Sequence, residues 1–383
     1  MSVILLVSAS EEDTQRLLEH GPRRDFLEIA AAINGSVRYR GEGARKGIRG
    51  KLFGPHIRQA WAQAGVTQPG DVIFADGEHI GLPLAIMLRL RRKRPAKVVM
   101  LGHLVSRRWK LALLWLATRM VRRGTLVLHS VEQQRLARRW VNRRWRIALI
   151  PYQVDTEFWQ APSTAASDRG DAPLVLAVGA ENRDYDTLLE SVRELPVRLI
   201  VAGGSHWARK DIATATDIPR NVTILTEPLG FAALRDLYAE ASIVAVPLVD
   251  VPNQSGITVL LEAMSMARPV VVSATTGQRE CVRGPLVTVD GEAGELGDRG
   301  PQHFGAPAGD DSGLYVPPED PESMRTAIAL LLADEPRVRA MGAAGRETVC
   351  RTFTTEAFSA AIAALLSPPP RRNAPAIEPD RQP

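Results

Sequence analysis

The chain has 383 residues, of which 45% are hydrophobic, 24% charged and 5% aromatic. This composition is typical of a folded globular protein and excludes a chain that is disordered throughout. The uncharged apolar stretch Leu111 to Thr118 is far shorter than the roughly 20 residues that span a bilayer. We expect no transmembrane helix, no secretory signal at the amino terminus, and a cytoplasmic protein.

The formal net charge of +5 hides an unequal distribution along the chain. Residues 1–150 hold 28 Lys and Arg against 11 Asp and Glu, whereas the remaining residues hold 20 against 32. A basic half can attract a phosphorylated substrate, an anionic membrane surface or nucleic acid, and charge alone does not choose among them. The two cysteines, Cys281 and Cys350, have no Cys or His nearby at metal-ligand spacing, so we expect neither a disulfide framework nor a zinc site.

Short apolar runs separated by helical stretches occupy the first half of the chain. They predict buried strands at 3–7, 71–75, 97–101, 125–129 and 146–150. Continuous apolar runs are typical of parallel strands that helices cover on both faces. The sequence therefore predicts an α/β domain over residues 1–160, and a segment rich in Ala, Ser, Asp, Gly and Pro at 160–173 marks its boundary.

The same pattern resumes after this boundary. It predicts strands at 174–178, 197–202, 222–225, 243–247 and 269–273, alternating with helices such as 187–194 and 232–241. We expect a second α/β domain over residues 173–353, in which 284–311 form a surface excursion. A C-terminal helix over 354–366 precedes a tail, 367–383, whose Pro and charge content predicts disorder.

The strongest local motif is the run from Asn253 to Met264, which follows a predicted strand. Ser255 is the expected N-cap of a helix that begins near Gly256, and free amides at such a helix start attract an anion. Thr258 and Glu262 then share one face of the helix. The motif predicts a phosphate site, and the alternative is an ordinary core helix with Glu262 in solvent.

Two other loops follow strands at the carboxyl edge of a predicted sheet, where open α/β sheets bind ligands. Arg183 lies after the strand at 174–178, and it either clamps a phosphate or is a solvated loop residue. The single Gly179 in this loop is too little for a dinucleotide fingerprint. Glu78 follows the strand at 71–75, and it either contacts a ligand or caps the next helix.

Two basic stretches with tryptophans are candidates for a membrane surface. Leu111 to Ala117, flanked by Arg and Lys, is either a buried helix with solvated basic ends or a surface helix. The segment 135–146 is the better candidate, because Trp140 and Trp145 lie among arginines and such pairs are typical of lipid interfaces. We expect an anionic membrane surface as a partner and do not expect nucleic acid.

Five segments occur in the order and spacing of the retaining glycosyltransferases of family four. They are 150–158, Val178-Gly179 with 183–185, 247–262, 269–271 and 312–320. The chain resembles this family densely from about 147 to 366 and only generally before it. The resemblance implies a GT-B architecture, with two Rossmann-like domains facing across a cleft. The second domain would bind a nucleotide-sugar, and the first would bind the acceptor.

The resemblance also implies roles for single residues. Glu262 would hold the donor ribose, Arg183 would bind its phosphates, and His103 would line the sugar site. Gln254 stands where the family usually has a sugar-binding glutamate, and Ala180 stands where an arginine is common. The remaining donor-binding residues by this resemblance are Gly179, Ser255, Gly256, Ile257 and Thr258.

The predicted function is retaining transfer of a sugar from a nucleotide-diphosphate sugar to a sugar or lipid-linked acceptor, such as a cell-envelope glycan. We expect His103, Arg183 and Gln254 to be catalytic, Glu78 to contact the acceptor, and no metal or cofactor to be needed. Two alternatives stay open. One is a nucleotide-sugar epimerase of the same architecture, and the other is a non-catalytic protein that binds RNA or lipid.

Overall fold

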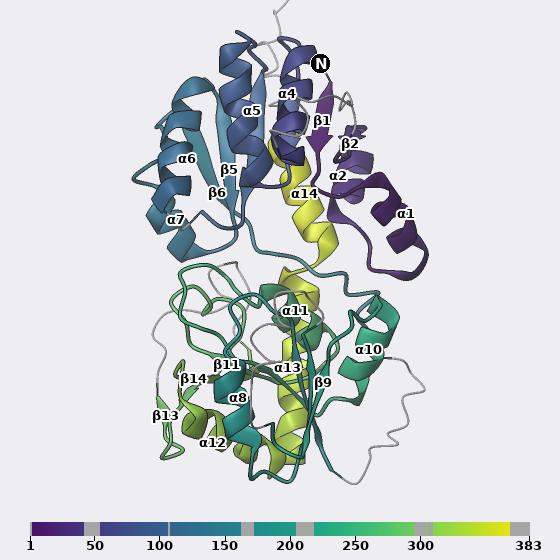
Figure 1. Ribbon diagram of the computed structural model, residues 1–383, viewed down its shortest axis with the longest axis vertical. Helices are drawn as coiled ribbons and strands as arrows, with labels where there is room; N and C mark the ends of the chain where they lie inside the picture. Colours follow the sequence, from purple (N-terminus) through teal and green to yellow (C-terminus); the bar gives the residue numbers. More distant parts are fainter. Residues whose placement is uncertain are drawn as a thin grey trace, which may run out of the picture.

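The computed structural model describes residues 2–41, 54–105, 108–161, 172–203, 218–294, 304 and 309–367. The chain folds into two α/β domains stacked along the long axis of the molecule, as Figure 1 shows. Residues 368–383 of the predicted tail and most of the predicted boundary segment lie outside the described residues.

The first domain is built on a six-stranded, fully parallel sheet. Its spatial order is β2-β1-β3-β4-β5-β6. The strands are β1 (Val3–Leu6), β2 (Ser36–Arg38), β3 (Val72–Ala75), β4 (Lys97–Gly102), β5 (Gly124–Leu128) and β6 (Trp145–Leu149). All but the short edge strand β2 were predicted from continuous apolar runs, because β3, β4 and β5 are buried on both faces.

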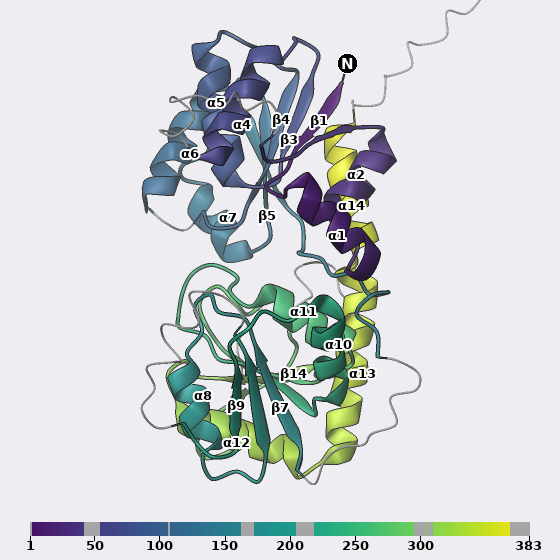
Figure 2. The same cartoon turned by 45° about the vertical axis from the view of Figure 1, so that its right-hand side comes forward.

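Helices cover both faces of this sheet. One face packs against α4 (Pro55–Val66), α5 (Glu78–Leu90), α6 (Arg108–Met120) and α7 (Val131–Ala137). The other face packs against α2 (Asp25–Ile33), with α1 (Glu11–His20) beside it, and against the last helix of the chain, α14 (Thr355–Leu366). The chain therefore returns from the second domain to complete the core of the first, as Figure 2 shows.

The second domain has an eight-stranded sheet in the order β13-β12-β14-β11-β10-β7-β8-β9. Its strands are β7 (Leu174–Val178), β8 (Arg198–Ala202), β9 (Val222–Leu225), β10 (Ile243–Val246), β11 (Val270–Ser273), β12 (Leu286–Val287), β13 (Ala293–Gly294) and β14 (Gly313–Val316). Only β12 and β13 pair antiparallel. This small hairpin lies in the segment expected to be an irregular surface excursion, where two-residue strands leave no periodic signal.

The helices of the second domain also form two layers. The helices α10 (Phe231–Glu240), α11 (Ile257–Ser265) and α13 (Glu335–Thr352) contribute to one core cluster. The helices α8 (Tyr185–Val192) and α12 (Pro321–Leu332) contribute to the other. Each sheet is thus enclosed by helices, and the loops at its carboxyl edge are left to form a site.

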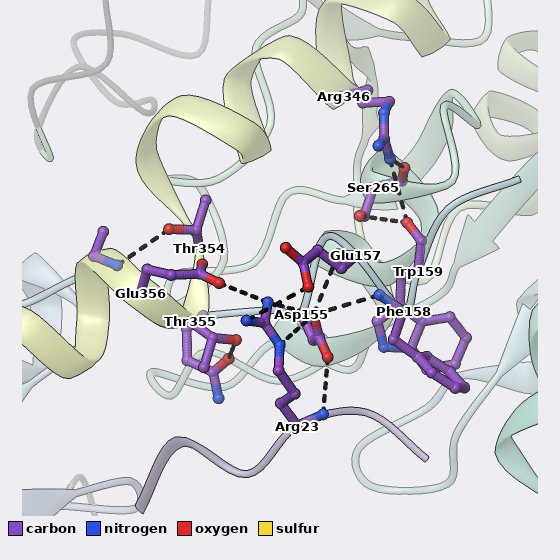
Figure 3. Close-up of polar contacts among 12 residues, drawn as sticks. Arg23, Asp155, Glu157, Phe158, Trp159, Ser265, Arg346, Thr354, Thr355 and Glu356 are labelled. Carbon is purple, nitrogen blue, oxygen red and sulfur yellow. Dashed lines mark hydrogen bonds and ion pairs between the residues drawn. The ribbon is translucent and has the colours of Figure 1, made fainter. Parts of the chain in front are cut away.

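The two domains are joined by paired crossover segments (Figure 3). Val154 and Thr354 form an isolated parallel bridge, in which the Val154 amide donates to the Phe353 carbonyl at 2.8 Å. The Asp155 carboxylate accepts from the Arg23 backbone amide and guanidinium, each at 2.8 Å. Arg23 also pairs with Glu356 at 2.6 Å. One arginine of the first domain therefore holds both crossings of the chain.

The prediction that Trp145 faces a membrane is wrong. Only 5% of Trp145 is exposed, and its indole N–H donates to the Val121 carbonyl at 3.0 Å. Trp140 is partly buried against the same core cluster. The exposed tryptophans of this basic region are Trp109 (57%) and Trp115 (44%), both on α6. Periodicity places Leu111 and Leu114 on the buried face of α6, so its two tryptophans turn outward.

Candidate functional site

The order of the second sheet determines where its site forms. The chain runs from β7 to β8 and β9 on one side, and then returns to β10 on the other side of β7. The loops after β7 and β10 therefore diverge at a topological switch point, where open α/β sheets bind ligands. These two loops contain Gly179, Arg183 and the run 253–256. An isolated bridge between Arg183 and Leu248 joins them.

A cavity of about 370 Å³ opens at this switch point and extends to the first domain. Its walls combine residues of both domains and of the crossover. They are His103, Leu104, His129, Gln133, Tyr152, Gly179, Ala180, Glu181, Arg183 and residues 253–259. Of the predicted site residues, His103, Gly179, Arg183, Gln254, Ser255, Gly256, Ile257 and Thr258 line it, while Glu78 and Glu262 do not.

Arg183 presents a positive charge to this cavity. Its Nε donates to the Val178 carbonyl at 3.0 Å and its Nη1 to the Glu181 carbonyl at 2.9 Å, and within the described chain no carboxylate pairs with it. Burial lowers the pKa of the guanidinium, because the charge is held away from water. A Cβ at Gly179 would lie 2.7 Å from Nη2, so the glycine makes room for this side chain.

The start of α11 adds backbone donors to the same cavity. Gly256 is the N-cap, with φ of +77°, and no side chain caps the helix. A Cβ there would lie 2.8 Å from Val246 and 3.6 Å from Arg183 Nη1, so only glycine fits. No acceptor in the described part of the chain takes the amides of Thr258 and Val259. Free amides beside an arginine can bind an anion.

The prediction that Ser255 is the N-cap of the helix is wrong. Its hydroxyl oxygen accepts from the side-chain amides of Asn182 and Asn253, each at 2.8 Å. The Ser255 carbonyl accepts from Gln278 at 2.9 Å. Because these contacts occupy the hydroxyl and tie together the loops after β7, β10 and β11, Ser255 shapes the turn, and the helix cap passes to Gly256.

Glu262 lies one turn behind Thr258 on α11 and is buried. Its carboxylate accepts from the Tyr238 hydroxyl at 2.9 Å. Burial raises the pKa of Glu262 to about 8, and the Tyr238 hydrogen bond offsets only part of this shift. The alternative that Glu262 lies in solvent is therefore wrong. Its predicted contact with a ribose stays a prediction.

Gln254 carries a buried acceptor that the described chain leaves unused. Its side-chain oxygen has no hydrogen-bond partner among the described residues, while its nitrogen lies 4.0 Å from the Cys281 sulfur. A buried amide oxygen without a hydrogen-bond partner costs folding free energy. A ligand hydroxyl that donates to this oxygen would therefore bind favourably.

His103 is held rigidly on the opposite wall of the cavity. Its Nε2 lies 2.8 Å from the Asp76 carbonyl, which only accepts, so Nε2 donates this hydrogen bond. Glu78 accepts from the His103 amide at 2.9 Å and pairs with Lys110 at 2.6 Å. Burial by itself would raise the pKa of Glu78, but Lys110 and the His103 amide lower it below its ordinary value. In this structure Glu78 positions His103.

His129 and Tyr152 are cavity residues that the sequence reasoning did not assign to the site. The His129 Nδ1 donates to the Ile150 carbonyl at 2.9 Å, and its buried Nε2 has no partner among the described residues. Burial lowers the pKa of His129 to about 3, so the ring stays neutral. The rings of His103 and His129 stack at 5.5 Å. Both histidines directly follow neighbouring strands, which is the signal that could have found His129.

The first sheet has its own switch point, between β1 and β3. Here one oxygen of Asp76 accepts from the Ser8 amide at 2.6 Å and from the Ser8 hydroxyl at 2.8 Å. The other Asp76 oxygen is buried and has no partner among the described residues. Burial raises the pKa of Asp76 to about 6. Asp76 therefore offers a free acceptor close to His103.

A direct contact also joins the two domains. Both oxygens of the buried Glu280 accept from the Val131 amide at 3.0 Å.

Among the described residues, no group of three or more His, Cys, Asp and Glu could hold a metal ion. None of the described helices has both the length and the apolar character needed to cross a membrane.

The sequence is similar to those of known glycosyltransferases. Residues 172–334 match the family model described as Glycosyl transferases group 1. A D-inositol 3-phosphate glycosyltransferase of Kineococcus radiotolerans is 32% identical over 222 residues, which cover 52% of this chain and 46% of the relative. The chain thus spans about half the length of that curated relative.

Several solved structures resemble the whole fold. Sucrose-phosphate synthase from Thermosynechococcus elongatus has a TM-score of 0.68 at 19% identity, over 95% of this chain and 98% of that one. HepE from Anabaena in complex with UDP-glucose has a TM-score of 0.67 at 14% identity, over 96% of this chain and 99% of that one.

The chain is a GT-B protein, so the predicted architecture of two Rossmann-like domains across a cleft is confirmed. Its second domain is similar to the Glycosyl transferases group 1 family, and the predicted resemblance to glycosyltransferases is confirmed.

Proposed function

We propose that this protein transfers a sugar, with retention of configuration, from a nucleotide-diphosphate sugar to an acceptor bound by the first domain. One observation carries the proposal. The guanidinium of Arg183, which pairs with no described carboxylate, and the α11 amides that no described acceptor takes converge on a cavity shared by both domains. That is the arrangement needed to stabilise a departing diphosphate. A solved relative, HepE, binds UDP-glucose.

The residues divide the work as follows. Arg183 and the amides of Thr258 and Val259 stabilise the negative charge that develops as the bond between the sugar and the diphosphate breaks. The acceptor hydroxyl forms the new bond on the same face, and its proton passes to the departing phosphate oxygen. The reaction as proposed uses no metal or cofactor, because the charge is compensated by these protein groups.

Sugar and acceptor meet on the wall that joins the domains. Gln254 and His129 each offer a buried acceptor atom for sugar hydroxyls. On the first domain, the free oxygen of Asp76 beside His103 is suited to an acceptor hydroxyl. Glu78 acts behind them by holding His103, and Glu262 completes the ribose side of the donor site.

The Arg183→Ala variant tests the donor site. It should lower kcat by about 100-fold or more, the scale typical of losing one charge-stabilising group. The matched control is Arg339→Ala, an exposed arginine on α13. The measurement is transfer and hydrolysis of nucleotide-sugars, with acceptor-independent epimer formation followed in parallel. An unchanged kcat in Arg183→Ala would remove this arginine from the mechanism.

We further propose that the protein is cytoplasmic and attaches peripherally to an anionic membrane surface through α6. Trp109 and Trp115 are exposed on this helix, and the Arg119 guanidinium lies 4.2 Å from the Trp115 ring centroid. Exposed tryptophan beside arginine suits the headgroup region. A membrane there would bring a lipid-linked acceptor to the basic domain.

Vesicle sedimentation tests this attachment. The parent should pellet with anionic vesicles and remain in the supernatant with neutral ones, and added salt should release it. Changing Trp109 and Trp115 together to Ser should abolish pelleting, whereas Trp61→Ser, an exposed tryptophan on α4, should leave it unchanged. A parent that stays in the supernatant with anionic vesicles contradicts the membrane proposal.

A further inference from the structure

The first domain contains a second cavity, of about 980 Å³, at the end of its sheet opposite to the cleft. Its walls come from the segments that lead into β4, β5 and β6, so it lies at the amino ends of these strands. His103 follows the other end of β4, which has 6 residues, so the cavity and the cleft are roughly 20 Å apart. The two sites are separate.

Positive side chains dominate the walls of this cavity. The end of α5 and the turn after it contribute Arg89 and residues 92–94. The end of α6 and the next turn contribute Arg119 and residues 122–123, and Arg144 comes from the turn before β6. No Asp or Glu is present among the described lining residues. The ion pairs of the described chain include none of these cations.

The backbone and the packing hold several of these cations in place. Arg92 has φ of +55°, a left-handed conformation that normally takes glycine after a helix end. Arg119 Nη1 donates to the Trp115 carbonyl at 2.8 Å while its guanidinium stacks on the Trp115 ring. Like charges gathered around one cavity repel each other, and a bound anion would relieve this repulsion.

We propose that this cavity binds a ligand with several phosphate groups, either the headgroup of an anionic phospholipid or a soluble polyphosphorylated molecule. Arginine guanidinium groups match phosphate oxygens in pairs of hydrogen bonds. The volume exceeds the need of a single phosphate, and the charge is spread over three chain segments. The proposal does not depend on glycosyl transfer in the cleft.

Isothermal titration of inorganic tripolyphosphate tests the cavity directly. The parent should bind it. Changing Arg94, Arg122 and Arg123 together to Ser should weaken binding by about tenfold or more, since each cation near clustered phosphates contributes substantially. The matched control changes Arg135, Arg138 and Arg139 together to Ser, which removes the same charge from α7 and its end, outside the cavity. This control should alter the affinity less than about twofold.

A single variant tests whether misfolding, and not the loss of charge, explains weaker tripolyphosphate binding. Arg92→Gly puts into the left-handed position the residue that adopts it most easily, so the fold should be kept or stabilised while binding weakens. A parent that does not bind tripolyphosphate, or two triple variants that lose affinity equally, would overturn the proposal.

A second arm separates the two sources of phosphate. If tripolyphosphate displaces the parent from vesicles that contain phosphatidic acid, and the cavity variant fails to pellet with them, the ligand is a lipid headgroup. If parent and cavity variant behave alike toward vesicles but differ toward tripolyphosphate, the ligand is soluble. Both results support the cavity as a phosphate site.

Discussion

At the residue scale, Glu262 shows how burial changes the chemistry of a carboxyl group. It is buried on α11, with the Tyr238 hydroxyl as its hydrogen-bond donor. Because burial disfavours the charged form, the pKa of Glu262 is raised to about 8 from an ordinary value of 4.5. The carboxyl group of this residue is therefore mostly protonated at neutral pH.

A stability measurement at two pH values checks this assignment. A raised carboxyl pKa means that the folded state loses stability as pH rises from about 4.5 to about 8. Glu262→Gln removes this loss, so we expect it to be more stable than the parent by about 4 kcal/mol at pH 9 and to differ from it by less than about 1 kcal/mol at pH 5. Urea unfolding monitors both. Equal stabilities at pH 9 would show that water reaches the parent carboxylate.

Two glycines at the site are required by the backbone conformation and by the lack of space for a side chain. Gly179 and Gly256 both have positive φ, and a Cβ on either would meet the Arg183 side chain or the strand behind it. They let the guanidinium of Arg183 lie between the loops after β7 and β10. The proposed anion site thus depends on the absence of a side chain at Gly179 and Gly256 as much as on the presence of Arg183.

At the scale of elements, α14 belongs structurally to the domain from which it is farthest in sequence. Phe358, Ile362 and Leu366 pack in one core cluster with Leu5 and Phe26 of the first domain. Lys97 also donates to the Leu365 carbonyl at 2.6 Å. The first domain is therefore incomplete until the whole chain is present.

Truncation of one side chain on α14 measures this contribution. Ile362→Ala should lower the free energy of unfolding by about 2–4 kcal/mol, because it leaves a cavity in a fully buried position. The control Ala360→Ser lies on the exposed face of the same helix and should change it by less than about 0.5 kcal/mol. Denaturant unfolding followed by tryptophan fluorescence reports both. A similar stability for parent and Ile362→Ala would mean that α14 is only loosely docked.

At the scale of the whole molecule, Arg23 and Asp155 hold the crossover between the domains (Figure 3). Burial alone would raise the pKa of Asp155, but the hydrogen bonds from Arg23 lower it below 3.8. A lowered carboxyl pKa contributes stability above the unfolded pKa, and this contribution is lost as pH falls through the folded value.

Removing this charge should loosen the crossover. Asp155→Ala should lower the free energy of unfolding by about 2–4 kcal/mol at pH 7, because it leaves a partly buried guanidinium without its main partner. The difference from the parent should shrink below pH 4, where the parent carboxylate also becomes protonated. Glu157→Gln is the control, since Glu157 is exposed and 3.6 Å from Arg23. Thermal unfolding across pH tests both variants. If Asp155→Ala is as stable as the parent at pH 7, this ion pair does not stabilise the crossover.

Sequence alone determined most strands of the two sheets and the loop of the proposed anion site. Buried parallel strands appear in the sequence as unbroken apolar runs. In a run such as 253–258, neighbouring residues by themselves indicate the loop and the helix start. The tertiary structure alone decided what depends on distant partners. It buried Trp145 and turned Trp109 outward, brought His129 beside His103, and placed α14 in the first core. These outcomes depend on which surfaces meet when remote segments pack, and spacing along the chain does not encode this.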